Sequence, residues 1–182
     1  MLILGASGGV GVCCLQIAKL AGAEVIACAG TDAKAQRLIE LGADKTINYV
    51  THDFQDEVYK LYGKPTRRGG GTDRGVDVVV NYTGGDTWVK SLKVLKVGGR
   101  LLTCGATAGY DPKTDIRYIW SFEFNIIGCN AWTDDDLREL LRRVADGRMK
   151  PVVHCQRPLS EIRDPFRQLM QREVFGKAVL VP

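Results

Sequence analysis

The sequence predicts a doubly wound α/β fold, in which helices cover both faces of a parallel sheet. Short apolar segments alternate with helical segments through most of the 182 residues. Some of the short segments are apolar almost throughout, as in VDVVVNY (76–82), which is typical of strands buried on both faces. The stretch ASGGVG (6–11) joins the first short segment to the first helical one. Together these features favour right-handed β-α-β units.

Six strands and four helices follow from the periodicity of the first 132 residues. The expected strands are residues 1–5, 24–29, 45–49, 76–82, 100–104 and 125–129. Helices are expected over 10–20, 33–41 and 54–62, and a fourth from Trp88 to Leu95 is closed by Gly98 and Gly99. Because residues 10–20 are apolar almost all round, we expect that helix to be buried.

After residue 132 the pattern changes. Thr133 can cap a helix that ends near Gly147. Its apolar stripe consists of Leu137, Leu140, Leu141 and Val144. A strand-like segment (151–159), an amphipathic helix with Ile162 and Phe166, and a closing strand (176–182) follow. These late strands do not continue the alternation, so we expect something else to pair with them, and we divide the chain into residues 1–132 and 133–182.

Composition excludes several classes of function. The chain is 45% hydrophobic and 25% charged, which is typical of a soluble globular protein. Its basic residues are scattered among acidic ones, and the dense spot at Arg67-Arg68 precedes three glycines without aromatic residues, so we expect a solvated loop and no nucleic-acid surface. No secretory leader or membrane-spanning segment is visible, and we expect a cytoplasmic protein.

The six cysteines carry no pattern of metal ligands, because they form no CxxC pair and lie near no histidine cluster. Cys28 and Cys104 lie inside strand-like runs, where cysteine behaves as a small hydrophobic residue. We therefore expect reduced thiols and no metal site.

The glycine turn is the strongest functional signal. It follows a strand and opens a helix, which is the context of a phosphate-binding turn. Gly8 would let a pyrophosphate approach the main chain, Gly11 would let the helix pack against the strand, and Ala6 replaces the usual first glycine. N–H groups at the helix start would bind the anion. The alternative is a glycine-rich turn without a ligand.

The end of the second strand indicates which nucleotide is bound. An Asp or Glu there usually holds the ribose hydroxyls of NAD, but this chain has Ala29, Gly30 and Thr31. Thr31 and Lys34 could instead bind a 2′-phosphate through charge-assisted hydrogen bonds. NADP(H) is therefore favoured over NAD(H), the alternative being that Lys34 is a solvated helix lysine.

Longer stretches resemble a known family. The segments GASGGVG, AGAEVIACAGTDAKAQRLIELGADKTINY, GVDVVVNYTGG, SLKVLKVGGRLLTCGATAGY and GKAVLVP resemble, in this order, the cofactor-binding half of the medium-chain dehydrogenase/reductase superfamily. Within it the chain looks most like quinone oxidoreductases and enoyl reductases. The stretch from Thr103 to Gly128 also resembles the crotonyl-CoA reductase branch.

The resemblance implies a six-stranded Rossmann sheet and a set of cofactor-binding residues. The backbone of Ser7, Gly8, Gly9 and Val10 would hold the pyrophosphate; Thr31, Lys34 and Tyr49 the 2′-phosphate; Asn81 and Thr83 the adenosine and ribose; Gly105, Ala106 and Thr107 the nicotinamide; and Cys129 and Asn130 its carboxamide. The alternatives are structural: Asn81 caps a strand, Tyr49 covers the sheet edge, and Gly105 serves a turn. No residue is identified as catalytic.

The chain also departs from the family, whose members begin with a separate catalytic domain. Met1 falls inside the first strand, so we expect a fragment or a separately encoded half-enzyme whose late segments would rejoin that domain. The expected reaction of the complete enzyme is hydride transfer between NADPH and a carbonyl, quinone or enoyl substrate, with little turnover by this chain alone.

Two other functions are considered. The chain could be an NADP(H)-binding or assembly module without catalysis, which turnover by the purified chain would refute. A methyltransferase is disfavoured, because it too needs an acid after the second strand. The resemblance also implies a homodimer that pairs through the sixth strand, residues 125–129.

Overall fold

The computed structural model of the chain describes residues 1–67 and 72–182. Six parallel strands form one sheet in the order β3-β2-β1-β4-β5-β6. Their bounds are Leu2–Ile3 (β1), Ile26–Ala29 (β2), Lys45–Asn48 (β3), Val76–Val80 (β4), Leu95–Thr103 (β5) and Asn125–Gly128 (β6). The predicted fold class is thus confirmed. The solvated loop expected from Arg67 onward falls mainly on residues 68–71, which lie outside the described residues.

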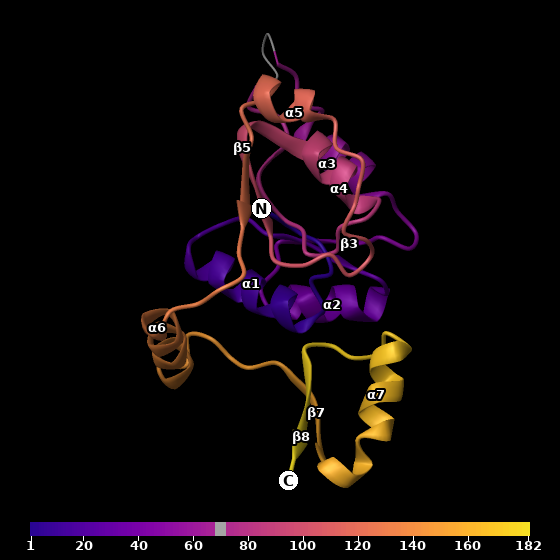
Figure 1. The fold of residues 1–182 in the computed structure, drawn as a ribbon, viewed down its shortest axis with the longest axis vertical. Coiled ribbons are helices and arrows are strands. Elements are labelled where there is room, and N and C mark those ends of the chain that lie inside the picture. The colour runs from indigo at the N-terminus through magenta and orange to yellow at the C-terminus, as the bar shows by residue number, and fades with distance from the viewer. Residues whose placement is uncertain (68–71) are drawn as a thin grey trace.

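Helices cover both faces of the sheet. Their bounds are Gly9–Leu20 (α1), Asp32–Glu40 (α2), Phe54–Tyr62 (α3), Thr87–Val94 (α4) and Ile116–Ser121 (α5). Helices α1 and α2 lie on one side and α3 and α4 on the other (Figure 1). Leu2 and Ile3, which are neighbours in β1, belong to separate buried clusters with these two helix pairs, since successive strand residues point to opposite faces.

Helix α1 is less buried than its sequence suggested. Val12 and Leu15 are buried, but Val10, Ile17 and Leu20 are between 41% and 45% exposed. A helix that packs on a sheet buries only the stripe facing that sheet, and apolar residues on its outer side do not by themselves bring a second layer. The expectation of a buried helix was therefore wrong for its outer side, where Val10, Ile17 and Leu20 are exposed.

The boundary between α4 and β5 also differs from the prediction. Helix α4 ends at Val94, and Gly98 and Gly99 lie inside β5 instead of closing a helix. Val76 pairs with Leu95 while Val78 pairs with Arg100, so the register shifts between these pairs. Gly98, whose φ is +73°, adopts there the backbone conformation that glycine tolerates best.

The C-terminal region contains α6 (Asp134–Ala145), β7 (Val153–Pro158), a 3₁₀ turn (Leu159–Glu161), α7 (Arg163–Met170) and β8 (Lys177–Val181). Thr133 caps α6 through a capping box with Asp136, as the sequence predicted for its start. Strands β7 and β8 pair with each other in parallel and form a two-stranded sheet of their own, separate from the six-stranded sheet.

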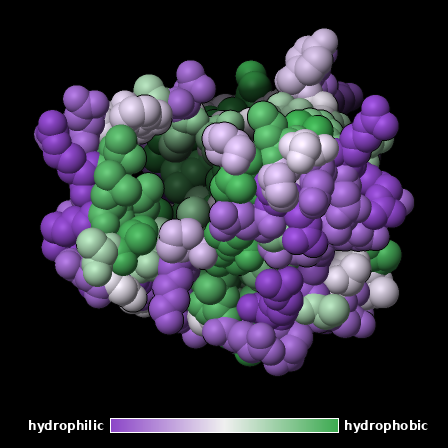
Figure 2. All heavy atoms as spheres, turned by 90° about the horizontal axis from the view of Figure 1, so that it is seen from below, coloured by the Kyte–Doolittle hydropathy of each residue, from purple (hydrophilic) through white to green (hydrophobic). Residues whose placement is uncertain are grey.

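Apolar side chains of the C-terminal helices remain at the surface. Helix α6 buries none of its residues, and Leu141 is 58% exposed. On α7, Phe166 and Met170 are 56% and 81% exposed. Seen from below, apolar side chains border a hollow in this face of the molecule (Figure 2). No helix in the described ranges is long and apolar enough to cross a membrane.

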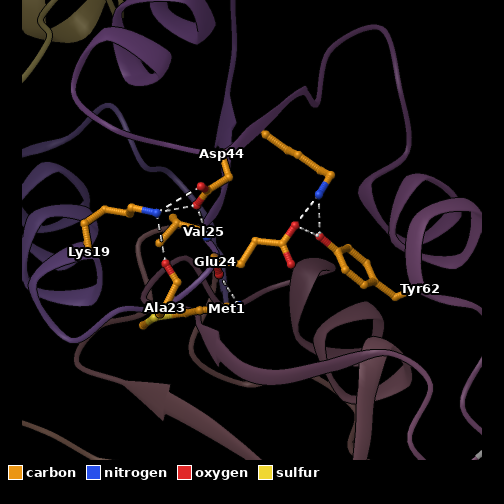
Figure 3. A network of polar contacts seen from close by, with 8 residues as sticks. Met1, Lys19, Ala23, Glu24, Val25, Asp44 and Tyr62 are labelled. Atoms are coloured by element: carbon orange, nitrogen blue, oxygen red, sulfur yellow. Dashed lines mark hydrogen bonds and ion pairs between the residues drawn. The ribbon is translucent and has the colours of Figure 1, made fainter.

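A polar network joins the amino ends of β2 and β3 (Figure 3). The Lys19 ammonium contacts Asp44 Oδ2 at 2.7 Å, and the Val25 N–H donates to the same oxygen at 2.7 Å. Nearby, the Tyr62 hydroxyl donates to Glu24 Oε1 at 2.8 Å. These contacts hold together the amino ends of β2 and β3, opposite the carboxyl ends of the strands.

The network predicts a pH-dependent contribution to stability. Hydrogen bonding from Lys19 and then from Val25 lowers the pKa of Asp44. A carboxylate with a lowered pKa stabilises the fold above its ordinary pKa and loses that contribution as the pH falls through the lowered value. We expect Asp44→Asn to reduce the free energy of unfolding by about 0.5–1 kcal/mol at pH 7 and by almost nothing at pH 2. Urea unfolding at both values measures this, and an equal loss at both would contradict it.

Candidate functional site

The glycine turn packs tightly between β1 and α1. The Ala6 N–H donates to the Cys28 carbonyl at 2.9 Å, and the Gly8 N–H donates to the Gly5 carbonyl at 3.0 Å. A Cβ on Gly11 would lie 2.5 Å from the Ala6 Cα, so this position requires glycine for the helix to approach the strand. A Cβ on Gly8 would meet only the Gly5 carbonyl oxygen, at 3.4 Å. Packing within the protein therefore requires glycine at position 11, whereas it would accept a Cβ at position 8.

The amino end of α1 has no side-chain cap. Gly8 is the N-cap residue, and the first turn has no acidic residue. In the part of the chain that the structure describes, the Val10 N–H has no acceptor, while Gly8 forms an isolated parallel bridge with Gly176 that brings the C-terminal segment alongside the Gly9 N–H. The first N–H groups of a helix lack partners within it and carry partial positive charge. An anion at this position would satisfy them.

Tyr82, two residues after the end of β4, contacts the turn. Its hydroxyl donates to the Gly5 carbonyl at 2.6 Å. Burial raises the pKa of Tyr82, and a hydrogen bond from the Gly11 N–H partly opposes that rise. The phenol therefore holds the backbone at the start of the turn, at Gly5.

The C-terminal segment crosses over the same turn. The Gly176 N–H donates to the Ser7 carbonyl at 2.8 Å. The Lys177 side chain lies directly over Gly9, since a Cβ there would be 2.1 Å from Lys177 Cε and 2.9 Å from its Nζ. The Arg37 guanidinium stacks 4.0 Å above the ring of Phe175. This arrangement places an ammonium group beside the open end of α1.

The residues after β2 hold the start of α2 and the C-terminal segment together. Thr31 caps α2 by accepting from the Lys34 N–H at 3.2 Å. Lys34 Nζ donates to the Val174 carbonyl at 2.9 Å and also to that of Arg172. Burial, and then Arg37, lowers the pKa of Lys34. Lys34 is therefore not the freely solvated lysine of the alternative interpretation.

One acidic residue lies close to this position. Asp32, at the first residue of α2, accepts a hydrogen bond from Asn48 Nδ2 at 2.7 Å. The carboxylate is thus bound to β3 through its Oδ1 atom. The end of β2 itself, at Ala29, carries no acid.

A crevice of about 550 Å³ opens at the carboxyl ends of the central strands. The strand order reverses between β1 and β4, which is where ligands bind in doubly wound sheets. The crevice brings together three of the predicted site residues, Tyr49, Thr83 and Thr107, with Tyr82 and Arg172. The Tyr49 hydroxyl lies over Gly30, where a Cβ would be 2.7 Å away.

Asn81 is fully buried and holds the turn after β4. Its Nδ2 donates to Ser91 at 2.9 Å and to Thr87 at 3.1 Å, and its Oδ1 accepts from the N–H groups of Thr83 and Gly84, both at 2.9 Å. With no exposed surface, the side chain acts as a structural cap, which is the alternative considered from the sequence.

The remaining predicted residues lie apart from the crevice. Gly105 and Ala106 line a separate cavity of about 340 Å³. Cys129 lines a groove of about 780 Å³ beside α1, and Asn130 is exposed. Cys104 is also exposed and follows the end of β5, so the expectation that it packs as a core residue was wrong. No group of three or more potential metal ligands is found among the described residues.

Sequence reasoning missed three residues that the structure brings to this region. Tyr82 braces the glycine turn, Arg172 lines the crevice, and Lys177 lies over Gly9. Tyr82 follows the predicted Asn81, so its place at the end of a central strand was the available signal. Arg172 and Lys177 lie far from the turn in sequence, and nothing local indicated their contact with it.

Comparison with known proteins agrees with this geometry. A family model described as zinc-binding dehydrogenase matches residues 9–146. The crotonyl-CoA reductase of Streptomyces collinus is 31% identical over 196 residues, covering 100% of this chain and 43% of the reductase. The chain spans about half the length of the curated relatives that it matches.

Two solved structures share the fold. An NAD-dependent alcohol dehydrogenase matches with a TM-score of 0.85 and 38% identity, over 100% of this chain and 50% of that one. The 2-octenoyl-CoA carboxylase reductase CinF, in complex with NADP and 2-octenoyl-CoA, matches with a TM-score of 0.85 and 26% identity, over 99% of this chain and 42% of that one.

Proposed function

Because the chain belongs to the zinc-binding dehydrogenase family, we propose that it is the NADP(H)-binding part of an oxidoreductase. The complete enzyme would transfer a hydride between NADPH and a carbonyl, quinone or enoyl substrate. When bound, the nicotinamide supplies the hydride donor or acceptor. The residues of this chain hold and orient that cofactor.

The open end of α1 is the observation that carries the proposal. The Val10 N–H has no acceptor among the described residues, and the Lys177 ammonium lies beside the neighbouring Gly9, next to the Gly8–Gly176 bridge. A pyrophosphate supplies both an acceptor and a compensating negative charge. Gly8 leaves room for it next to the main chain. The crevice at the switch point would then accept the adenosine, with Tyr49 and Thr83 in its wall.

The end of β2 supports a phosphorylated ribose. Ala29 leaves no carboxylate at the strand end, while Thr31 and Lys34 supply a hydroxyl and an ammonium group. Lys34 already binds two main-chain carbonyls, so a 2′-phosphate would replace one or both of them. Arg172 lines the neighbouring crevice and adds a second basic side chain.

Lys34→Ala tests the phosphate pocket. We expect the variant to bind NADPH about 10- to 100-fold more weakly and to bind NADH unchanged, since a charge-assisted hydrogen bond contributes ~1.5–3 kcal/mol. Intrinsic fluorescence of Trp88, Trp120 and Trp132 follows both titrations. An equal loss of affinity for NADPH and NADH would show that Lys34 only holds the C-terminal segment in place.

The chain divides into two proposed parts at residue 132. We propose that residues 1–132 form the dinucleotide-binding domain and that 133–182 rejoin a catalytic domain in the complete enzyme. The exposed apolar residues on α6 and α7 favour such a partner. They also support the second candidate, an NADP(H)-binding or assembly module, and turnover of a quinone or enoyl substrate by the purified chain would exclude it.

Self-association through β6 is a further part of the proposal. Strand β6 is the edge of the sheet, and all four of its residues are exposed. An open edge presents unpaired N–H and C=O groups to a second strand. We expect the purified chain to elute as a dimer in size-exclusion chromatography at micromolar concentration. Elution as a monomer would contradict pairing through this edge.

A further inference from the structure

Two cysteines lie side by side at the carboxyl ends of β5 and β6. Thr103 pairs with Gly128 in the parallel register of these strands. The next residues along the two strands are Cys104 and Cys129, and the Cys129 N–H donates to the Thr103 carbonyl at 2.8 Å. The two cysteines therefore directly follow the last in-register pair of these strands.

Both cysteines line the same groove. Cys104 and Cys129 line the groove of about 780 Å³ together with Leu102 and Ile127, which precede them by two residues on the same strands. Side chains two residues apart in a strand share a face. Both cysteines are exposed, so a small reagent can reach them.

The spacing of neighbouring strands suits a cross-link. Paired strands lie about 4.8 Å apart. A disulfide requires its two Cα atoms to be about 4.4–6.8 Å apart. Cys104 and Cys129 each follow the last in-register pair by one residue, so their Cα atoms are expected near this range. The ends of strands also adjust more easily than their centres because fewer ladder hydrogen bonds hold them.

We propose that Cys104 and Cys129 form an oxidisable dithiol that closes to a disulfide. With a peroxide as the oxidant, one thiolate attacks an O–O bond and gives a sulfenic acid with release of water. The second thiol then attacks that sulfur, forms the S–S bond and releases a second water. Two thiols are oxidised and one hydrogen peroxide is reduced. The proposal does not depend on cofactor binding.

The electrostatics agree with this proximity. Burial raises the pKa of Cys104, and the neighbouring Cys129 raises it further. Cys14 lines the same groove from α1, and burial, followed by Cys104, raises the pKa of Cys14 to about 11. Cys14 therefore shares the groove with both thiols and serves as the matched control.

Peptide mapping of the oxidised full chain tests the proposal. Trypsin places Cys104 in residues 101–113 and Cys129 in residues 118–138. After hydrogen peroxide treatment and alkylation, we expect these two peptides to be linked within a monomer band on a non-reducing gel. The number of free thiols in the denatured chain should fall from six to four and recover with dithiothreitol.

Variants and a second reagent identify the pair. Cys104→Ser and Cys129→Ser should each abolish the linked peptides, while Cys14→Ser should leave them unchanged. Phenylarsine oxide, a trivalent arsenical that binds two adjacent thiols, should protect these two cysteines from alkylation. Peptides linked through Cys14, a Cys129 link between two chains, or separate oxidation of both thiols without a link would overturn the proposal.

Discussion

Gly8→Ala is expected to bind NADPH about 100-fold more weakly than the parent chain while folding equally well. The added methyl group would meet only the Gly5 carbonyl oxygen, at 3.4 Å, which is an ordinary contact. The backbone of Gly8, with φ −80° and ψ 170°, is also one that alanine adopts freely. The fold therefore has no reason to require glycine at this position, and only the approach of a ligand does.

The expected size of the effect follows from the contacts that a displaced pyrophosphate would lose. Two charge-assisted hydrogen bonds, to the N–H groups of Gly9 and Val10, contribute ~1.5–3 kcal/mol each. Loss of part of both corresponds to roughly 100-fold in affinity. Fluorescence titration measures the affinity and thermal unfolding monitored by circular dichroism measures the fold.

Gly11→Ala is the matched comparison, because we expect it to destabilise the fold, whereas Gly8→Ala should impair only cofactor binding. Its methyl group would lie 2.5 Å from the Ala6 Cα, so α1 or the turn must move. We expect destabilisation by about 1–3 kcal/mol, as for other overpacked sites. A Gly8→Ala chain that binds NADPH normally, or that unfolds as readily as Gly11→Ala, would show that the turn is only structural.

Lys177→Met is expected to lower the affinities for NADPH and for NADH by about the same factor, roughly tenfold. The ammonium lies beside the open end of α1, where it would contact the pyrophosphate that both cofactors share. Methionine keeps most of the apolar stem that covers Gly9 and removes only the charge. The affinity of the parent chain should also fall more steeply with salt than that of the variant.

Lys60→Met is the control for this charge. Lys60 lies on α3, where it pairs with Glu57 at 2.6 Å, on the face of the sheet away from α1. It should leave both affinities unchanged. If Lys177→Met lowers only the affinity for NADPH, the ammonium lies at the 2′-phosphate instead. If neither affinity changes, Lys177 is not part of the site.

Much of the fold could be predicted because its signals are local. Apolar runs such as residues 76–82 and the capping residue Thr133 mark strands and helix starts within a few positions. The glycines at 98 and 99 misled for the same reason, since a helix end and an irregular strand favour glycine equally. The pairing of β7 with β8 could not be seen, because it joins segments separated by a helix.

The sequence identified several residues of the candidate site, but it did not reveal which groups those residues contact. Gly8 and Gly11 were identified by the chemistry of the turn, and the structure gives each a distinct surrounding. Lys34 was expected at a phosphate, but its ammonium binds main-chain carbonyls of the C-terminal segment. Main-chain carbonyls have no signature in a sequence, and neither does the approach of Lys177 to Gly9. Such contacts depend on how the chain returns to the turn.

Backbone amide chemical shifts test the central claim most directly. A ¹⁵N-labelled chain titrated with NADPH should show its largest, saturable shifts at residues 7–11, above all at the N–H groups of Gly9 and Val10. The Gly8→Ala chain should lack these shifts at the same concentrations. Saturable binding whose largest shifts map to the groove beside Cys14, with residues 7–11 unmoved, would contradict the account.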